Sequence, residues 1–275
     1  MTYGLRSVTV HLGGVTALDD VTALVEPGSV LAVVGGDGAG KTTLLRALVR
    51  EVPLEQGTVD APDKGDLGFL PASAGSWAGL TVRQNLDFVA GIYGLTGDAL
   101  AQRRAELITA ADLAVATDRP AAQLSGGMRR KLGFCMAMMH RPALVVLDEP
   151  STGVDPVSRV ELWRLIATAA ARGAAVVMST TYLDEAERAN QLLVLDEGRA
   201  LVAGSYEDVR AGFPGTITQG AHPVRQEWSW RRGTDRHEYW PDGGAPSELA
   251  LVEPDLEDIV VALSLTRRLP VEARS

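Results

Sequence analysis

Five short runs of the chain are almost entirely apolar, and segments with helical periodicity separate most of them. The runs are VLAVV (30–34), LGFL (67–70), ALVVL (143–147), AAVVM (174–178) and QLLVL (191–195). A strand that is covered on both faces reads as a continuous apolar run of this length, so the runs predict five strands of a buried, largely parallel sheet. Strands that alternate with helices predict an α/β domain, in which ligands bind at the carboxyl ends of the strands.

Helical patterns fill most of the intervals between these strands. We predict helices in the segments 42–51, 81–94 and 99–115, and a fourth helix that begins at Asp155. Asp155 is suited to the N-cap of this fourth helix, Pro156 to its first turn, and Gly173 to its end. The range from about 80 to 142 contains helical patterns without a buried strand, so we expect it to be a helical insertion.

The character of the chain changes beyond Gly204. Turn-rich stretches appear, and three of the five tryptophans lie in EWSWRRGTDRHEYW (227–240), where polar and aromatic residues alternate. This pattern predicts a small separate appendage with strands, and the expected ranges are 1–215 for the main domain and 216–275 for the appendage. Aromatic and arginine side chains can also form a surface that stacks nucleic-acid bases. The prediction is instead a half-buried strand pair in which Arg231, Arg232 and Arg236 are solvated.

Composition and charge exclude several classes of protein. Of the 275 residues, 46% are hydrophobic and 22% are charged, which is typical of a globular chain. The net charge of −9 argues against a nucleic-acid partner, because such proteins neutralise backbone phosphates with basic surfaces. Cys135 is the single cysteine, and its apolar surroundings predict a buried thiol. No signal-peptide pattern and no apolar run of ~18 residues is present, so we expect a cytoplasmic protein without a membrane span.

A glycine-rich loop, GGDGAGKTT (35–43), follows the first apolar run and precedes a helical segment. Its residues fit the pattern G-x-x-x-x-G-K-[ST], in which backbone N–H groups and a helix N-terminus bind the phosphates of a nucleotide. Lys41 is expected to reach the β- and γ-phosphates, and the Thr42 hydroxyl to ligate Mg²⁺. The expected phosphate-binding residues are Gly35, Gly36, Asp37, Gly38, Ala39, Gly40, Lys41, Thr42 and Thr43.

Two carboxylates follow directly after the apolar run of LVVLDEP. Asp148 is placed where a strand ends, and we expect it to hold the Mg²⁺ ion through the water shell of the metal. Glu149 is the adjacent residue, so its side chain can point instead toward an attacking water. We therefore predict a metal site made by Thr42 and Asp148, with Glu149 as the catalytic carboxylate.

The stretch LSGGM (124–128), followed by RRK, resembles the signature of the ATP-binding-cassette (ABC) ATPases. The resemblance covers residues 4–203 and implies a P-loop NTPase fold. That fold has a parallel central sheet, an N-terminal antiparallel β subdomain and an inserted helical subdomain, and here a small C-terminal appendage follows. The resemblance also implies that two cassettes face head to tail, each binding ATP and Mg²⁺ between its own phosphate loop and the partner's signature. Ser125, Gly126 and Gly127 begin a helix and so offer donors to the γ-phosphate.

Further segments are similar to other parts of the same family. STGVDP (151–156) is similar to the loop that crosses to the second cassette, with Asp155 at its aspartate. The segment 79–94 is similar to the region that receives the coupling element of a membrane subunit. EPDLEDIVVAL (253–263) resembles the tail of the daunorubicin-exporter branch. The resemblance implies a peripheral protein at the cytoplasmic face of the membrane, with a separate transmembrane permease as its partner in multidrug export.

Three positions depart from the family pattern. Ala72 stands where the family has a glutamine, Thr181 where it has a histidine, and Leu12 where it has an aromatic residue that stacks on adenine. A threonine can donate one hydrogen bond but carries no positive charge. Loss of one preorganised donor typically lowers a rate by ~10²–10³, so we expect slow hydrolysis at the site built on this chain's own loop.

Three functions are compatible with these motifs. The leading hypothesis is the energy-coupling ATPase subunit of an exporter. The alternative is a degenerate, mainly regulatory nucleotide-binding subunit that pairs with an intact cassette, and the sequence leaves open whether the cassettes form a homodimer or a heterodimer. A ribosome-acting translation factor of the same superfamily usually has two cassettes and a charged linker, and this chain has one cassette and no such linker.

Overall fold

The computed structural model describes residues 2–73 and 75–268. The expected domain ranges 1–215 and 216–275 therefore include a few positions, Met1, Ala74 and 269–275, that lie outside the described residues. The chain divides into two compact units, Met1–Ala200 and Leu201–Ser275, and the boundary falls within strand β9 (Arg199–Gly204).

The first unit is built around a six-stranded sheet with the order β5-β6-β7-β3-β8-β9. All five apolar runs form strands of this sheet, and the registers along β5-β6-β7-β3-β8 are parallel, as predicted. The sixth strand, β9, was not predicted, although it contains the short apolar stretch ALVA (200–203); its residues are exposed or only half-buried at the sheet edge. The bounds of the five strands are β3 (Val30–Val34), β5 (Leu67–Leu70), β6 (Leu144–Leu147), β7 (Ala175–Thr180) and β8 (Gln191–Asp196).

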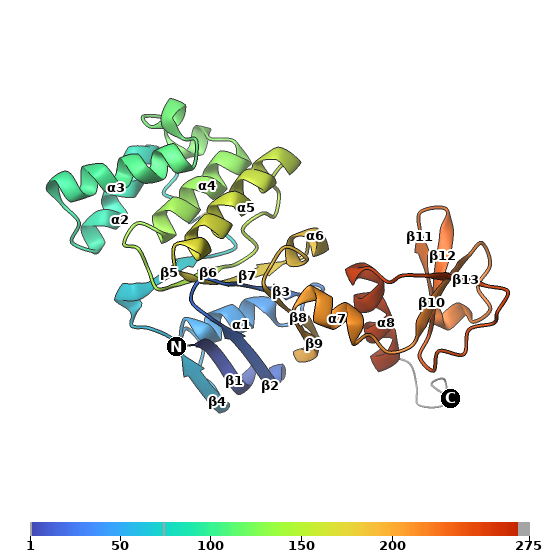
Figure 1. Ribbon diagram of the computed structural model, residues 1–275. Coiled ribbons are helices and arrows are strands. Elements are labelled where there is room, and N and C mark those ends of the chain that lie inside the picture. Colours follow the sequence, from blue (N-terminus) through green and yellow to red (C-terminus); the bar gives the residue numbers. More distant parts are fainter. Residues whose placement is uncertain (1, 74, 269–275) are drawn as a thin grey trace. The chain divides into compact units, whose positions relative to one another are not determined.

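A second sheet of the first unit is antiparallel and has the order β2-β1-β4. Its strands are β1 (Tyr3–Leu12), β2 (Val15–Val25) and β4 (Gln56–Asp60). Figure 1 shows helix α1 (Lys41–Leu48) between this sheet and the central sheet. Leu44, Leu45 and Leu48 of this helix are fully buried in one core with both sheets, and each such side chain stabilises the fold by roughly 1.5–3 kcal/mol. The helix that follows the glycine-rich loop is thus held rigidly.

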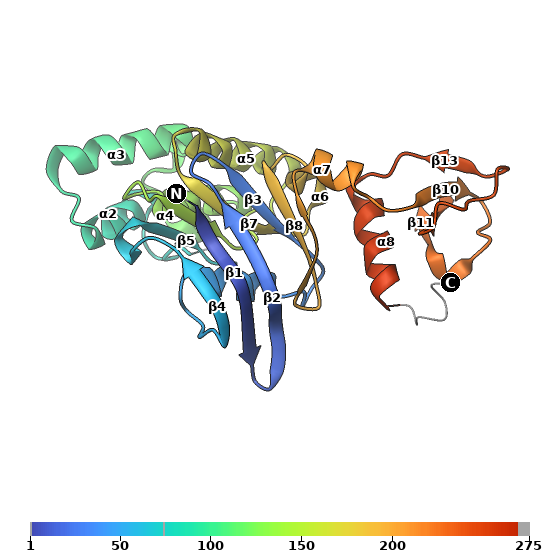
Figure 2. The same ribbon diagram turned by 60° about the horizontal axis from the view of Figure 1, so that its bottom comes forward.

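The other helices of the first unit lie across the central sheet from α1 (Figures 1 and 2). The predicted helical insertion contains α2 (Val82–Ile92), α3 (Gly97–Ala110) and α4 (Gly126–Ala137), and α5 (Pro156–Ala171) and α6 (Leu183–Ala186) follow. Helix α5 has the predicted ends. Asp155 accepts N–H bonds from Val157 at 3.1 Å and Ser158 at 3.0 Å, and the helix stops before Gly173.

The second unit contains a four-stranded antiparallel sheet with the order β11-β12-β10-β13. Its strands are β10 (Thr216–Gly220), β11 (Ser229–Arg232), β12 (Asp235–Trp240) and β13 (Ala250–Val252), and its helices are α7 (Tyr206–Ala211) and α8 (Leu256–Arg268). Trp228 and Tyr239 are almost fully buried in a small core of this unit. The tryptophans therefore pack inward, as a half-buried strand pair requires.

The prediction that the three arginines of this strand pair are solvated is wrong for two of them. Arg231 is exposed, but Arg232 is half-buried and forms ion pairs with Asp255 and Glu257. Arg236 is also half-buried and donates to the Ser229 hydroxyl at 3.0 Å. A strand pair whose inner face is aromatic leaves the guanidinium groups at its margin, where Asp255, just before α8, and Glu257 of α8 pair with Arg232.

Candidate functional site

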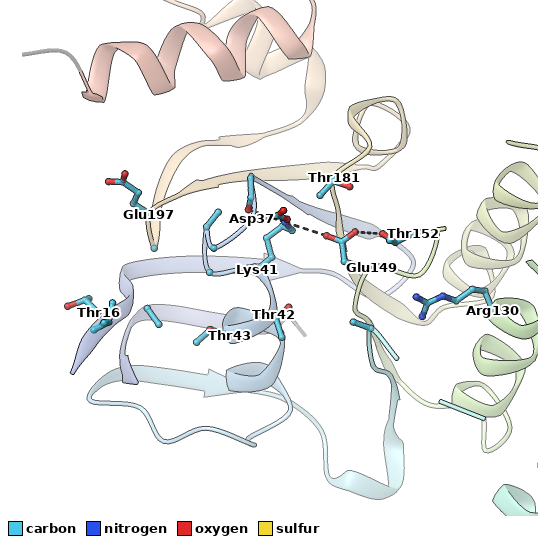
Figure 3. Close-up of a pocket in the computed structure, with 18 residues that line it drawn as sticks. Thr16, Asp37, Lys41, Thr42, Thr43, Arg130, Glu149, Thr152, Thr181 and Glu197 are labelled. Atoms are coloured by element: carbon cyan, nitrogen blue, oxygen red, sulfur yellow. Dashed lines mark hydrogen bonds and ion pairs between the residues drawn. The ribbon is translucent and has the colours of Figure 1, made fainter. Parts of the chain in front are cut away.

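The glycine-rich loop connects β3 to α1 and lines a cleft of about 940 Å³ (Figure 3). Gly40, the residue before the helix, has φ +104°, a conformation that side chains with a Cβ rarely adopt. A Cβ at this position would also lie 2.7 Å from the Ala17 carbonyl oxygen. Because α1 begins at Lys41, the N–H groups of its first turn have no partner within the helix. These donors and the helix dipole suit the cleft to an anion.

Lys41 extends back along the loop. Its ammonium group donates to the carbonyl oxygens of Gly35 at 2.8 Å and Gly36 at 3.2 Å. The same group lies 3.4 Å from a carboxylate oxygen of Glu149. The side chain is only 8% exposed, so its charge is weakly screened by solvent.

A hydroxyl and a carboxylate meet beside this lysine. Thr42 donates to Asp148 Oδ1 at 3.2 Å, and Ser179 of β7 donates to the same oxygen at 2.7 Å. Asp148 is 3% exposed and follows the end of β6. Mg²⁺ prefers oxygen ligands and retains several waters, so one hydroxyl and one carboxylate in contact fit this ion. Among the described residues, no group of three or more acidic, histidine or cysteine side chains could hold a metal, so the fit rests on Thr42 and Asp148.

Glu149 is held by its neighbours on both sides. Its backbone has φ +47°, the left-handed region, which costs of order 1–3 kcal/mol for a residue other than glycine. Its N–H donates to the Ser179 hydroxyl at 2.8 Å, and its side chain accepts a bond from Thr152 at 2.8 Å. Figure 3 shows the carboxylate between Lys41 and Thr152. The strained backbone places a carboxylate directly beside the loop lysine.

Most of the predicted site residues come together in this cleft. Its lining includes Gly36, Asp37, Gly38, Ala39, Gly40, Lys41, Thr42, Thr43 and Glu149. Gly35 and Asp148 are not among the lining residues, but they bond to Lys41 and Thr42 as described. Ala72 and Thr181, two of the three positions that we predicted to depart from the family pattern, also line the cleft.

The predicted signature residues lie elsewhere. Ser125 caps helix α4, where its side chain accepts a bond from the Met128 N–H at 3.2 Å, and Gly126 and Gly127 form the first turn. A Cβ at Gly127 would lie 2.4 Å from the Ser158 hydroxyl, so a glycine is needed where α4 packs on the start of α5. Neither these three residues nor Asp155 lines the cleft. The signature lies beside Gly153 and Asp155 of the STGVDP loop, whereas Thr152 of the same loop lines the cleft.

Thr152, Glu197 and Gly198 line the cleft without having been predicted, and two further features were not predicted from the sequence either. Arg130 of α4 lines it, and the guanidinium group donates to the Ser73 carbonyl oxygen at 3.3 Å. Burial lowers the pKa of Arg130, and the nearby charges of Asp148 and Glu149 oppose that shift. The RRK stretch indicated a basic helical turn, but nothing in its spacing showed which arginine returns to the cleft.

The second unpredicted feature lies at the other end of the cleft, which is lined by Val15, Thr16 and Ala17 of β2. The position expected for adenine stacking, Leu12, is not among these lining residues. His11, the residue before it, contacts Glu55 and the Thr16 hydroxyl.

The fold and this cleft define a P-loop nucleotide-binding protein, and comparisons with known proteins agree. Residues 18–152 match the ABC transporter family. The chain is 38% identical to the probable multidrug ABC transporter ATP-binding protein YbhF of Escherichia coli over 68% of this chain and 34% of that protein. It is 38% identical to the daunorubicin resistance ATP-binding protein DrrA2 of Streptomyces coeruleorubidus over 72% of this chain and 66% of that protein.

The match to a third relative spans a larger share of that relative. The chain is 31% identical to the Nod factor export ATP-binding protein I of Cupriavidus metallidurans over 74% of this chain and 71% of that protein. A solved ATP-binding subunit of an ABC transporter matches with a TM-score of 0.71 and 25% identity, over 78% of this chain and 93% of that one. The chain therefore belongs to the ATP-binding proteins of the ABC transporter family. It spans about a third of the E. coli relative and about two thirds of the Streptomyces relative.

Proposed function

We propose that this protein is the ATP-binding subunit of an ABC exporter. It binds ATP with Mg²⁺ at the cleft, pairs head to tail with a second cassette, and couples hydrolysis to transport by a separate transmembrane permease. The observation that carries the proposal is the convergence of Lys41, Thr42, Asp148 and Glu149 at the end of a glycine-rich loop. The names of the relatives, which refer to multidrug transport, daunorubicin resistance and Nod factor export, support export as the direction.

Each residue of the cleft has a distinct part in this proposal. Lys41 and the first-turn N–H groups of α1 bind the terminal phosphates, and Thr42 and Asp148 hold Mg²⁺. The ion, when bound, neutralises charge on the phosphates. Glu149 orients the attacking water and accepts its proton, and the bond from Thr152 fixes the direction of that carboxylate.

The second cassette is supported by the position of the signature. Ser125, Gly126 and Gly127 begin a helix whose first N–H groups are suited to a phosphate, yet they do not line the cleft of their own chain. A γ-phosphate that reaches these donors must come from another molecule. Asp155 lies beside them, at the loop that we propose contacts the second cassette.

The assembled protein is expected to be peripheral at the cytoplasmic face of the membrane. Among the described residues, no helix is both long and apolar enough to cross a membrane.

We further propose that the site built on this chain's own loop hydrolyses ATP slowly. Ala72 offers no side-chain donor to the cleft, and Thr181 offers one uncharged hydroxyl. The phosphate-binding groups are all present, whereas the family's glutamine and histidine are replaced at these two positions. This contrast favours a pair in which the site built on the second cassette's loop hydrolyses ATP faster. A mainly regulatory subunit is the second candidate, and the same two residues favour it.

The C-terminal appendage, for which we propose the range 216–275, is a module outside the nucleotide domain 1–215. Its described strands pair only with one another, and they have their own core around Trp228 and Tyr239.

Equilibrium binding of a fluorescent ATP analogue to the purified chain tests the proposed function. Wild type is expected to bind in the presence of Mg²⁺, and Lys41→Ala is expected to lose binding because it removes the loop cation. Lys64→Ala is the matched control, because Lys64 is exposed and lies outside the cleft. Equal affinities of wild type and Lys41→Ala would exclude the assigned phosphate site.

A further inference from the structure

The STGVDP loop (151–156) and the segment that follows Thr181 share one buried carboxylate. Glu185 of α6 is 3% exposed and lies away from the cleft lining. Its Oε2 accepts a hydrogen bond from the Ser151 hydroxyl at 2.8 Å and another from the Thr180 hydroxyl at 2.7 Å. One oxygen thus joins the loop after β6 to the end of β7.

This carboxylate depends on the two hydroxyl groups. Burial raises the pKa of Glu185, and the bonds from Thr180 and Ser151 oppose that shift. The nearest cation, Arg159 Nε, is 3.6 Å from Oε1, which is too far for a hydrogen bond. A buried polar group without partners is unfavourable, so a displacement of either segment leaves the carboxylate poorly satisfied.

A second contact joins the same two segments. Arg159, in the first turn of α5, donates to both carboxylate oxygens of Asp184 at 3.1 and 2.8 Å. Its guanidinium group also lies 3.9 Å above the ring of Tyr182. The backbone N–H of Arg159 donates to the Asp155 carbonyl oxygen at 2.9 Å, which ties this arginine to the end of the loop. The residues immediately after Thr181 are therefore held at two points, Glu185 by Ser151 and Asp184 by Arg159.

The loop also holds Glu149. Ser151 and Thr152 are consecutive, and their hydroxyls donate to different acids, Ser151 to Glu185 and Thr152 to Glu149. Ser151 is buried and Thr152 is exposed, so the two side chains point to opposite sides of the loop. A shift of this one loop changes the support of Glu149 and of the segment bearing Thr181 together.

We propose that Glu185 is a positioning residue that makes the STGVDP loop and the segment 180–186 move as one unit. A displacement of the loop on contact with a second cassette then moves Glu149 and position 181 at the same time. This role rests on the proposed function in one respect, that the loop meets a second cassette. The mechanical coupling itself is a property of this chain alone.

Hydrogen exchange of the purified full-length chain without nucleotide, read by mass spectrometry, tests the coupling in both directions. In Ser151→Ala, amides of 180–187 are expected to exchange about tenfold faster, which corresponds to about 1.4 kcal/mol. In Glu185→Ala, amides of 151–158 are expected to accelerate by a similar factor. Glu185→Gln keeps an acceptor oxygen for both hydroxyls and should restore most of the protection. Glu187→Ala, at an exposed position on the same segment, should match wild type.

The proposal is overturned if each variant accelerates exchange only in its own segment, because Glu185 would then stabilise the fold locally without linking the two. If Glu185→Ala does not fold, Ser151→Ala decides the question alone, because it removes a single hydroxyl. The measurement contains no ATP, so its failure leaves the proposed function standing. Conversely, failure of ATP to bind the wild type overturns the function without affecting this coupling.

Discussion

The ammonium group of Lys41 lies 3.4 Å from a carboxylate oxygen of Glu149, and the two side chains are 8% and 16% exposed. Lys41 is the first residue of α1, directly after the loop that follows β3, and Glu149 lies two residues beyond the end of β6. An opposite-charge pair in a poorly solvated cleft interacts more strongly than one on the surface. The cation that we propose binds phosphate and the proposed catalytic carboxylate are thus electrostatically linked.

This pair predicts that Glu149→Gln binds ATP more tightly than wild type, by about tenfold, because the carboxylate no longer competes for Lys41 or repels the phosphates. The affinity is measured by titration with a fluorescent ATP analogue. Glu51→Gln removes an exposed carboxylate outside the cleft and should leave the affinity unchanged. Weaker binding by Glu149→Gln would show that the carboxylate supports the bound state.

Placing a glutamine at position 72 and a histidine at position 181 should accelerate hydrolysis. Ala72 and Thr181 line the cleft and are both exposed, so larger side chains have room there. The double substitution Ala72→Gln and Thr181→His is expected to raise the single-turnover rate by at least about tenfold, since it adds two preorganised polar groups. Ser73→Gln, one position along, serves as the control. An unchanged rate in the double variant would mean that neither position limits the chemistry.

Local patterns were sufficient to predict much of the fold. Val30–Val34 and Leu144–Leu147 read as strands because both of their faces are buried, and Asp155 and Pro156 marked the start of α5 because capping is a local interaction. The edge strand β9 contains only four apolar residues in a row, and these are exposed or half-buried, so burial on both faces does not mark it. Its place in the sheet depends on its partner β8, which no local pattern encodes.

The cleft was predictable only as far as its residues belong to contiguous motifs. Lys41, Thr42, Asp148 and Glu149 stand in two short stretches whose chemistry is legible from residue type and position. Arg130 and Glu185 reach their partners across gaps in the chain, Arg130 to the Ser73 carbonyl and Glu185 to the Ser151 hydroxyl. Such contacts depend on tertiary packing, so the sequence without its fold could not have shown them.

The single thiol should be inert while the chain is folded. Burial raises the pKa of Cys135 from 9.0 to about 12, so its thiolate fraction near pH 8 falls by about 10³. Labelling with iodoacetamide, followed by mass spectrometry, is expected to be slower in the folded chain than in urea by at least that factor. A folded rate within about tenfold of the unfolded rate would contradict the burial.

The same shift predicts a pH dependence of stability. Below pH 9 both states keep the thiol proton, and between pH 9 and about 12 only the unfolded state loses it. The unfolded state then binds fewer protons than the folded state. The free energy of unfolding therefore falls as pH rises through this window, and this thiol contributes about 1.4 kcal/mol per pH unit to the decrease. Cys135→Ala should lack this component when the free energy of unfolding is compared at pH 8.5 and 10.

Trp228 should be critical for the second unit and dispensable for the nucleotide site. Its side chain is 1% exposed in a core with Ile217 and Tyr239, and truncation of a buried aromatic residue costs about 3–5 kcal/mol. Trp228→Ala is expected to make residues 216–268 sensitive to limited proteolysis while ATP affinity is retained. Val224→Ala, at an exposed position, is the control. Loss of ATP binding in Trp228→Ala would show that the appendage is needed by the nucleotide domain.

The single-turnover rate of ATP hydrolysis by the purified chain alone, with the chain in excess over ATP and with Mg²⁺ at a saturating concentration, tests the central claim most directly. We propose that the chain binds ATP through Lys41 and Thr42, and it presents Ala72 and Thr181 to the cleft. It is therefore expected to hydrolyse ATP far more slowly than ~1 s⁻¹, the lower end of the ordinary enzyme range. A rate of ~1 s⁻¹ or faster from the chain alone would contradict the account, because Thr181 or a water would then be sufficient for the chemistry that we assign to a second cassette.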